Sequence, residues 1–300
     1  MLLERATSAV LWKAEAHAAG LAAADWHPVT SAVATIGHDG RLCLWDGLTG
    51  TLTRTCAAAA LWGMAVQWSA DGRWLASAAG RAVQVWTPEG DEHRTWPGHR
   101  ATVADLVWHP SDAQLCAATY GGLVILAPDA QKPLRTLNWQ GSSLVARWSP
   151  DGKYIVTGEQ DSSVHFWITA TGKDLQMTGY PGKVLELSWS PDSRWLATGG
   201  GREVCIWHCG GKGPKGTTPL VVSGHRDRVS AVAFHPDGRL LASGSDDGQV
   251  RMWRVDGADR CAPAGALDLG EPVSQLVWSP DGRDVLVGGA RGAVWLVHPG

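Results

Sequence analysis

A tryptophan-containing segment that recurs seven times is the feature that most constrains how this 300-residue chain can fold. In most copies the aromatic residue is followed by Ser or His, and then by all or part of the series Pro, Asp, Gly. Successive copies lie 42, 40, 40, 41, 45 and 44 residues apart, beginning at Trp26, Trp68, Trp108, Trp148, Trp189, Phe234 and Trp278. This period predicts a repeat architecture, because a single unit of that size cannot bury its apolar residues alone.

Each copy carries the residue pattern of four short strands. In the sixth copy, residues 229–234 alternate in the way that puts every second side chain on one face of a strand. Residues 236–238 (Pro-Asp-Gly) supply a turn, and two further strands are expected over 240–244 and 249–253. A weaker strand over 219–222 precedes the copy. Four short antiparallel strands per copy are typical of a β-propeller blade, so the sequence predicts an all-β fold.

The sixth copy also resembles the signature of the WD-repeat family. The matching segments are Gly224-His225, residues 241–248 (Leu-Ala-Ser-Gly-Ser-Asp-Asp-Gly) and Val250-Arg251-Met252-Trp253. The resemblance covers about residues 8 to 298. It implies a seven-bladed β-propeller of four-stranded antiparallel blades, formed by residues 1–300 as a single domain. It also implies that the N-terminal strand, residues 8–13, closes the ring by pairing into the last blade as its outer strand.

In WD-repeat proteins four side chains form a polar network within a regular blade. A chain of hydrogen bonds from Trp to a hydroxyl, an imidazole and a carboxylate leaves no buried member unsatisfied. The resemblance places complete sets in two blades, namely His17, Thr35, Asp39 and Trp45, and His225, Ser243, Asp247 and Trp253. The other sets are incomplete. The fourth blade has Thr157, Asp161 and Trp167, with Trp139 at the histidine position, and the fifth has Tyr180, Thr198 and Trp207. The second blade has Ser77 and Trp86, and the third has only His99. Because these residues recur by repeat position, we interpret them as structural and not as a hydrolase triad.

Partner binding in this family is expected on one face, here called the top face. It consists of the loops before the first strands and the turns between the second and third strands. Repeat positions place these residues there: Trp62, Tyr120, Lys183, Arg228, His38, Gln160 and Asp246. Trp and Arg are enriched among residues that dominate binding energy. Structural alternatives stay open, since Trp62 could fill space beside residues 57–60, Tyr120 could cover its own blade, and the charged residues could be solvated.

Composition narrows the classes of partner. A formal net charge of -3 gives no basic stripe of the kind that binds phosphate backbones, so nucleic acid is an unlikely partner. No apolar run approaches the roughly 18 residues that span a bilayer. No signal peptide is recognisable, so the six cysteines are expected to be reduced thiols in the cytoplasm. Cys205, His208 and Cys209 lie close together, but zinc needs four convergent ligands, so we expect packing and no metal.

These features predict a non-catalytic scaffold or adaptor that binds a protein partner mainly through the top face. No cofactor is expected, and the propeller would be a monomer or a subunit of a larger complex. The alternative is a propeller enzyme or ligand-binding protein with its site at the mouth of the central channel. That alternative needs several ionisable groups converging there, whereas the residues expected to line the channel are mostly apolar or small: Ala22, Met64, Ala104, Leu144, Leu185, Ser230 and Ser274.

Overall fold

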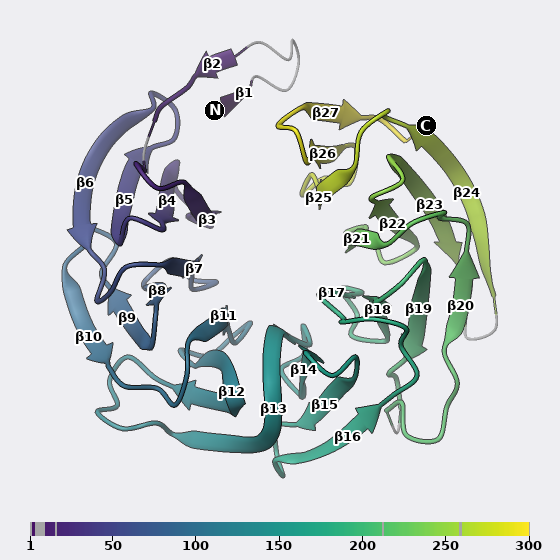
Figure 1. Ribbon diagram of the computed structural model, residues 1–300, viewed down its shortest axis with the longest axis horizontal. Coiled ribbons are helices and arrows are strands. Elements are labelled where there is room, and N and C mark those ends of the chain that lie inside the picture. The colour runs from purple at the N-terminus through teal and green to yellow at the C-terminus, as the bar shows by residue number, and fades with distance from the viewer. Residues whose placement is uncertain (1, 4–9, 16, 212, 258–259, 300) are drawn as a thin grey trace. The chain divides into compact units, whose positions relative to one another are not determined.

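The computed structural model describes residues 2–3, 10–15, 17–211, 213–257 and 260–299. These residues form strands, turns and loops, and no helix occurs among them. The chain divides into two compact units, residues 1–148 and residues 149–300. Figure 1 shows the strands of each sheet side by side in sequence order, for example β3 to β6.

The first unit contains a two-stranded sheet, two four-stranded sheets and the first three strands of a six-stranded sheet. The two-stranded sheet pairs β1 (Leu2–Leu3) with β2 (Val10–Trp12). The first four-stranded sheet holds β3 (Leu21–Trp26), β4 (Ala32–Gly37), β5 (Arg41–Asp46) and β6 (Thr51–Ala57). The second holds β7 (Gly63–Trp68), β8 (Leu75–Ala79), β9 (Ala82–Trp86) and β10 (Glu92–Trp96). The six-stranded sheet begins with β11 (Val103–Trp108), β12 (Leu115–Leu126) and β13 (Arg135–Trp148).

The second unit contains the other three strands of that sheet, two four-stranded sheets and a three-stranded sheet. The six-stranded sheet ends with β14 (Tyr154–Glu159), β15 (Val164–Ile168) and β16 (Lys173–Met177). The first four-stranded sheet of this unit holds β17 (Glu186–Trp189), β18 (Trp195–Gly199), β19 (Glu203–His208) and β20 (Leu220–Ser223). The second holds β21 (Val229–Phe234), β22 (Leu240–Ser245), β23 (Gln249–Val255) and β24 (Cys261–Asp268). The last sheet holds β25 (Val273–Trp278), β26 (Val285–Gly289) and β27 (Val294–Val297).

The middle strands are buried on both faces because neighbouring sheets of the same unit pack against them. Every residue of β8, β9 and β18 is buried. One apolar cluster joins the sheets β3–β6 and β7–β10 and includes Ile36, Leu42, Val66, Trp68 and Leu75. A second joins β17–β20 to β21–β24 and includes Val204, Ile206, Leu241 and Trp253. Burial on both faces explains why these strands are nearly continuous apolar runs and do not alternate.

The recurrent Ser-Pro-Asp-Gly sequence forms the turn between the first and second strands. Ser149 Oγ donates to Asp151 Oδ1 at 2.7 Å and accepts the backbone N–H of Tyr154 at 3.0 Å. Gly152 then adopts a φ of 70°, a left-handed conformation that favours glycine. These bonds fix the turn between the two strands.

In three copies the tryptophan that ends a first strand bonds the first strand of the preceding copy. The indole N–H of Trp108 donates to the carbonyl of Gln67 at 2.9 Å, and that of Trp278 donates to the carbonyl of Ala233 at 2.9 Å. The same bond joins Trp148 to Val107 at 3.1 Å. Each acceptor belongs to the first strand of the preceding copy. The indole therefore combines apolar burial with one directional bond between sheets.

The prediction of seven four-stranded blades was wrong, because the described residues form six sheets of three or more strands. β12 covers the second and third strands expected of the third copy, with a register shift between Tyr120 and Gly122 in place of a polar turn. β13 likewise runs from the outer strand of the third copy into the first strand of the fourth. Two copies therefore share one strand and count as a single sheet of strands β11 to β16.

The predicted ring closure by residues 8–13 stays a prediction. Residues 8 and 9 of the expected closing strand lie outside the described residues, and Val10–Trp12 pairs with Leu2–Leu3. The last sheet consists of β25, β26 and β27 among the residues described. The indole N–H of Trp12 donates to the carbonyl of Gly47 at 2.8 Å, which ties this segment to the first four-stranded sheet. A local antiparallel pairing and this bond therefore hold the segment in the first unit.

Replacing Trp278 by phenylalanine tests the bond between sheets. The variant keeps an aromatic ring but leaves the carbonyl of Ala233 without its donor, so we expect a loss of about 2 kcal/mol in the free energy of unfolding. Urea denaturation measures this value. Trp26→Phe is the control, because Trp26 is 48% exposed and its replacement should cost less than about 0.5 kcal/mol. Equal costs for the two variants would contradict the assigned role.

Candidate functional site

The four side chains expected to form a network in the first copy lie within hydrogen-bond distance of one another. Trp45 Nε1 donates to Thr35 Oγ1 at 2.9 Å, and His17 Nε2 lies 3.0 Å from the same oxygen. His17 Nδ1 lies 3.0 Å from Asp39 Oδ1. Burial alone would raise the pKa of Asp39, but hydrogen bonds from His17 and from backbone N–H groups lower it below its usual value. The carboxylate therefore stays charged and orients the imidazole.

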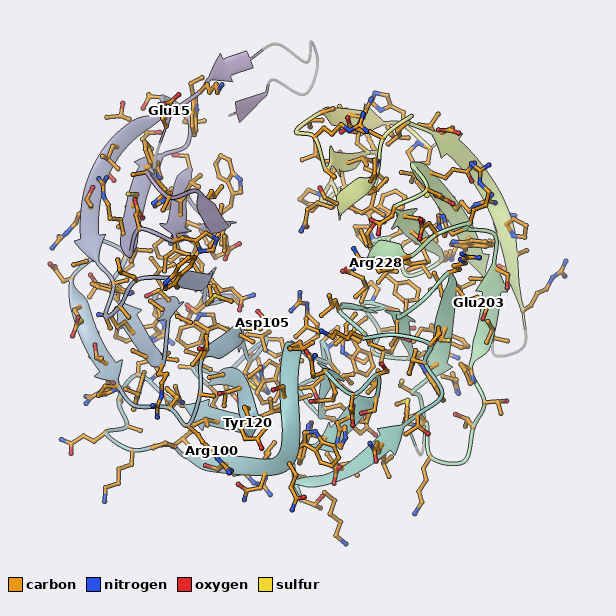
Figure 2. The ribbon with its side chains drawn as sticks, viewed as in Figure 1. Glu15, Arg100, Asp105, Tyr120, Glu203 and Arg228 are labelled. Carbon is orange, nitrogen blue, oxygen red and sulfur yellow. The ribbon has the colours of Figure 1, made fainter. Side chains whose placement is uncertain are left out.

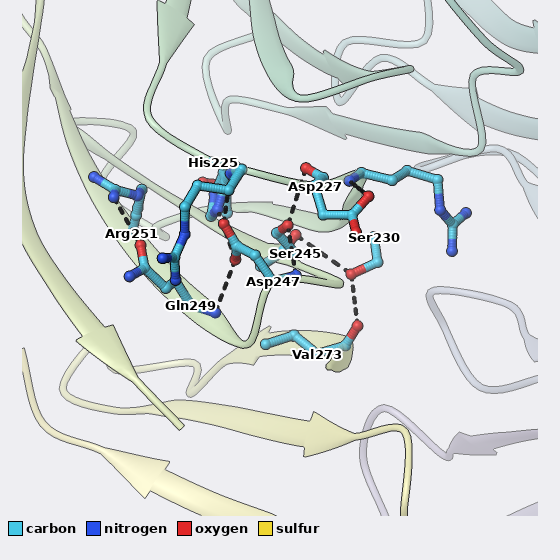
Figure 3. A network of polar contacts seen from close by, with 12 residues as sticks. His225, Asp227, Ser230, Ser245, Asp247, Gln249, Arg251 and Val273 are labelled. Atoms are coloured by element: carbon cyan, nitrogen blue, oxygen red, sulfur yellow. Dashed lines mark hydrogen bonds and ion pairs between the residues drawn. The ribbon is translucent and has the colours of Figure 1, made fainter. Parts of the chain in front are cut away.

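The sixth copy repeats this arrangement, and Figure 3 shows its His225 and Asp247. Ser243 Oγ accepts the indole N–H of Trp253 at 2.8 Å and lies 2.8 Å from His225 Nε2, while His225 Nδ1 lies 3.4 Å from Asp247 Oδ1. Asp247 also accepts the backbone N–H of Arg226 at 2.7 Å. Burial lowers the pKa of His225, and the neighbouring carboxylate offsets part of that change. A neutral imidazole fits a structural role.

Other copies satisfy the indole in other ways. In the fifth copy, Trp207 Nε1 donates to the hydroxyl of Tyr180 at 2.9 Å, and that hydroxyl lies 2.8 Å from Thr198 Oγ1. In the second copy, Trp86 Nε1 donates to Ser77 Oγ at 2.9 Å without a histidine, since Ala59 occupies that position. The hydrogen bond to the indole is thus kept in these two copies although the histidine and the aspartate are not.

The fourth and third copies depart further. Thr157 Oγ1 donates to Glu159 Oε1 at 2.6 Å, and Asp161 bonds Ser163, so neither forms the expected network with Trp167. In the third copy, His99 is buried and its Nε2 has no hydrogen-bond partner among the described residues. Burial lowers the pKa of His99, with Arg81 as a second cause, so its ring is neutral near pH 7.

Trp62 is the most exposed of the expected top-face residues in the first unit. It is 65% exposed, and its backbone has a φ of 64°, which is strained for a residue with a Cβ. Two backbone bonds hold it there, from Trp62 N to the carbonyl of His38 at 3.1 Å and from Gly80 N to the carbonyl of Trp62 at 3.3 Å. Its ring centroid lies 5.5 Å from that of His38. The exposure argues against the alternative that Trp62 fills space beside residues 57–60.

Of the remaining expected residues, only Arg228 and Asp246 form an ion pair with each other among the described residues. Tyr120 is 44% exposed in the first unit. In the second unit Arg228 Nε lies 3.0 Å from Asp246 Oδ2, while Lys183 and Gln160 are exposed. The structure therefore brings together His38 with Trp62, and Arg228 with Asp246.

Two arginines of the first unit lie beside these residues and were missed by the sequence analysis. Figure 2 shows Arg100 next to Tyr120, and the guanidinium carbon of Arg100 lies 5.3 Å from the centre of the tyrosine ring. Arg81 directly follows Gly80, whose N–H bonds the carbonyl of Trp62. Both arginines occupy the loop positions that define the top face in consecutive copies. Comparing those positions for charge, as well as for aromatic residues, would have identified them.

The cysteine and histidine group of the fifth copy is accounted for by packing. The ring of His208 lies 4.8 Å from that of Trp195, and Cys209 Sγ donates to the carbonyl of Trp207 at 3.6 Å. Burial, with the charge of Glu203 as a second cause, raises the pKa of the Cys205 thiol to about 11. No group of three or more His, Cys, Asp or Glu residues in the described part of the chain could hold a metal ion.

The blade-like sheets, the tryptophan-anchored repeats and the two complete polar networks define a repeat protein of the β-propeller class. The family described as "WD domain, G-beta repeat" matches residues 50–87, 90–126, 131–167, 173–208 and 216–254, which is more than half of the chain. The chain belongs to the WD40-repeat family. No helix of the described residues is long and apolar enough to cross a membrane.

Several relatives are similar over most of this chain. The nuclear distribution protein PAC1 of Arthroderma benhamiae is 25% identical over 310 residues, which cover 89% of this chain and 65% of that protein. The WD repeat-containing protein WDS homolog of Arabidopsis thaliana is 25% identical, covering 82% and 51%. The guanine nucleotide-binding protein subunit beta of Solanum tuberosum is 21% identical, covering 94% and 69%. The chain thus spans less than two thirds of the first two of these proteins.

A comparison of Ser243→Ala with Ser77→Ala tests the networks. Ser243 Oγ bonds both Trp253 and His225, whereas Ser77 Oγ bonds Trp86 where no histidine is present. We expect Ser243→Ala to lower the free energy of unfolding by about 2 kcal/mol and Ser77→Ala by about 1 kcal/mol, since each buried polar group left unsatisfied adds a cost. Urea denaturation followed by tryptophan fluorescence measures both values. A Ser77→Ala cost equal to or above that of Ser243→Ala would refute the two-partner network.

Proposed function

We propose that this chain is a non-catalytic interaction module that binds a protein partner through its top-face loops. The observation that carries the proposal is Trp62, a large aromatic residue held exposed in a strained backbone conformation by two backbone bonds. Such strain persists where the surrounding structure enforces it, and it clusters at binding sites. Exposed tryptophan is also the residue type most enriched at the energetic centres of interfaces.

Family membership supports the same proposal. One relative is by name a subunit, the guanine nucleotide-binding protein subunit beta of Solanum tuberosum, and therefore a component of an assembly. In the networks of the first and sixth copies, the hydroxyl groups of Thr35 and Ser243 accept the indole N–H groups of Trp45 and Trp253. We infer that they serve the fold and supply no catalytic group. All six cysteines are free thiols, which supports a reducing compartment, and we propose the cytoplasm.

Capture of a protein partner tests the proposal. We expect the double variant Trp62→Ala with Arg228→Ala to lose most of its capture of a partner from cell extract, while circular dichroism shows unchanged folding. Truncating residues at the centre of an interface costs about 2 kcal/mol or more, roughly thirty-fold in affinity. Pull-downs quantified by mass spectrometry give the measurement and the identity of the partner.

The matched control is Trp26→Ala with Arg283→Ala. It removes another exposed tryptophan, and an arginine that is likewise paired with an aspartate, Asp281. Full capture by this control and loss by the top-face variant support the proposal. Undiminished capture by the top-face variant, or equal loss in both, would show that the partner binds elsewhere.

A further inference from the structure

The loops around Trp62 and Tyr120 form one continuous strip within the first unit. Gly80 N bonds the carbonyl of Trp62 at 3.3 Å, and the carbonyl of Gly80 accepts the N–H of Val103 at 2.9 Å. Val103 pairs with Thr119, the residue before Tyr120. These bonds link Trp62, through Gly80, to Tyr120. We call the strip of Trp62, Arg81, Arg100 and Tyr120 the arginine strip.

Two guanidinium groups lie on this strip, and neither is neutralised by a carboxylate. Arg81 Nε donates to the carbonyl of His99 at 2.5 Å, and the guanidinium of Arg100 lies over the ring of Tyr120. Both arginines are exposed. Neither forms an ion pair with a carboxylate among the described residues. The strip therefore carries two positive charges that are open to an incoming anion.

In this respect the strip differs from the arginines that have a carboxylate partner. Six arginines pair with an aspartate, in the pairs Arg54 with Asp91, Arg73 with Asp71, Arg147 with Asp105, Arg194 with Asp192, Arg228 with Asp246, and Arg283 with Asp281. On the strip, a backbone carbonyl and an aromatic ring hold the guanidinium groups instead. Both partners fix the position of a guanidinium without cancelling its charge, which leaves N–H donors free for a carboxylate.

The aromatic residues at the two ends of the strip add an apolar component. Trp62 and Tyr120 are among the exposed large apolar residues of the first unit, together with the neighbouring Leu61. His99 lies between the arginines in the sequence, and its neutral ring adds no charge. A matching ligand therefore needs carboxylates to meet the two arginines and a large apolar side chain to contact Trp62.

We propose that the arginine strip binds an acidic segment of a protein partner that carries a leucine or phenylalanine anchor among aspartate and glutamate residues. This inference rests on the proposed function and specifies the chemistry of the partner. The carboxylates contact the guanidinium groups of Arg81 and Arg100, and the apolar anchor packs on Trp62. Binding weakens with salt, because the attraction between exposed charges is screened.

The test uses the full chain and a fluorescein-labelled peptide, acetyl-Glu-Asp-Glu-Leu-Phe-Glu-Asp-Glu-amide, in fluorescence anisotropy titrations. The control peptide replaces each acid by its amide, Gln or Asn. We expect the acidic peptide to bind at least about ten-fold more tightly than the control, which is about 1.4 kcal/mol. Its affinity should fall as NaCl rises from about 0.05 to about 0.5 M.

Matched variants separate the strip from general electrostatics. Arg81→Gln with Arg100→Gln should weaken binding of the acidic peptide at least about ten-fold. Arg54→Gln with Arg73→Gln removes the same number of charges from arginines paired with aspartates and should leave the affinity within about two-fold. No binding of the acidic peptide, or equal loss in both double variants, overturns the inference.

The outcomes also distinguish this inference from the proposed function. If partner capture depends on Trp62 but Arg81→Gln with Arg100→Gln captures normally, the inference fails and the proposed function stands. If neither Trp62→Ala with Arg228→Ala nor Arg81→Gln with Arg100→Gln alters capture, and the peptide does not bind, both the inference and the proposed function fail. Binding of phosphatidylserine vesicles in place of the peptide, with the same dependence on the two arginines, would also overturn the assignment of an acidic protein segment.

Discussion

Three pairs of consecutive copies are joined by one recurrent interaction, in which the indole of a first strand donates to a backbone carbonyl of the preceding first strand. It joins Trp108 to Gln67, Trp148 to Val107 and Trp278 to Ala233. Each indole also buries a large apolar surface, so the same side chain supplies both the hydrophobic and the directional part of the contact.

Within a sheet, the polar networks differ from copy to copy. The first and sixth copies use a histidine and an aspartate around the tryptophan, the fifth uses Tyr180, and the second uses Ser77 alone. What these four copies preserve is an acceptor for a buried indole N–H, since leaving it unpaired is costly. The residues that supply the acceptor can therefore change from copy to copy. The sequences of the neighbouring loops can then change as well and serve binding.

The sequence allowed the repeat, the strands within each copy and the four members of two polar networks to be identified. It did not allow the number of sheets to be predicted. Tyr120 was expected in the turn between a second and a third strand, yet Gly121 and Gly122 after it adopt φ values of 98° and 112° within one long strand. The pairing of residues 10–12 with residues 2–3 and the bond from Trp12 to Gly47 could not be predicted either, because periodicity does not show such contacts. The sequence shows that Arg81 and Arg100 are positively charged. Only the fold shows that neither has a carboxylate partner among the described residues.

Hydrogen exchange of the tryptophan indole N–H groups, followed by NMR of the ¹⁵N-labelled chain, tests the role of the indole bonds most directly. Resonances are assigned from single Trp→Phe variants. The account predicts slow exchange for Trp108, Trp148 and Trp278, whose N–H groups are bonded to the first strand of the preceding copy, and fast exchange for the exposed Trp26 and Trp62. Exchange of Trp108 and Trp278 as fast as that of Trp62 would contradict it.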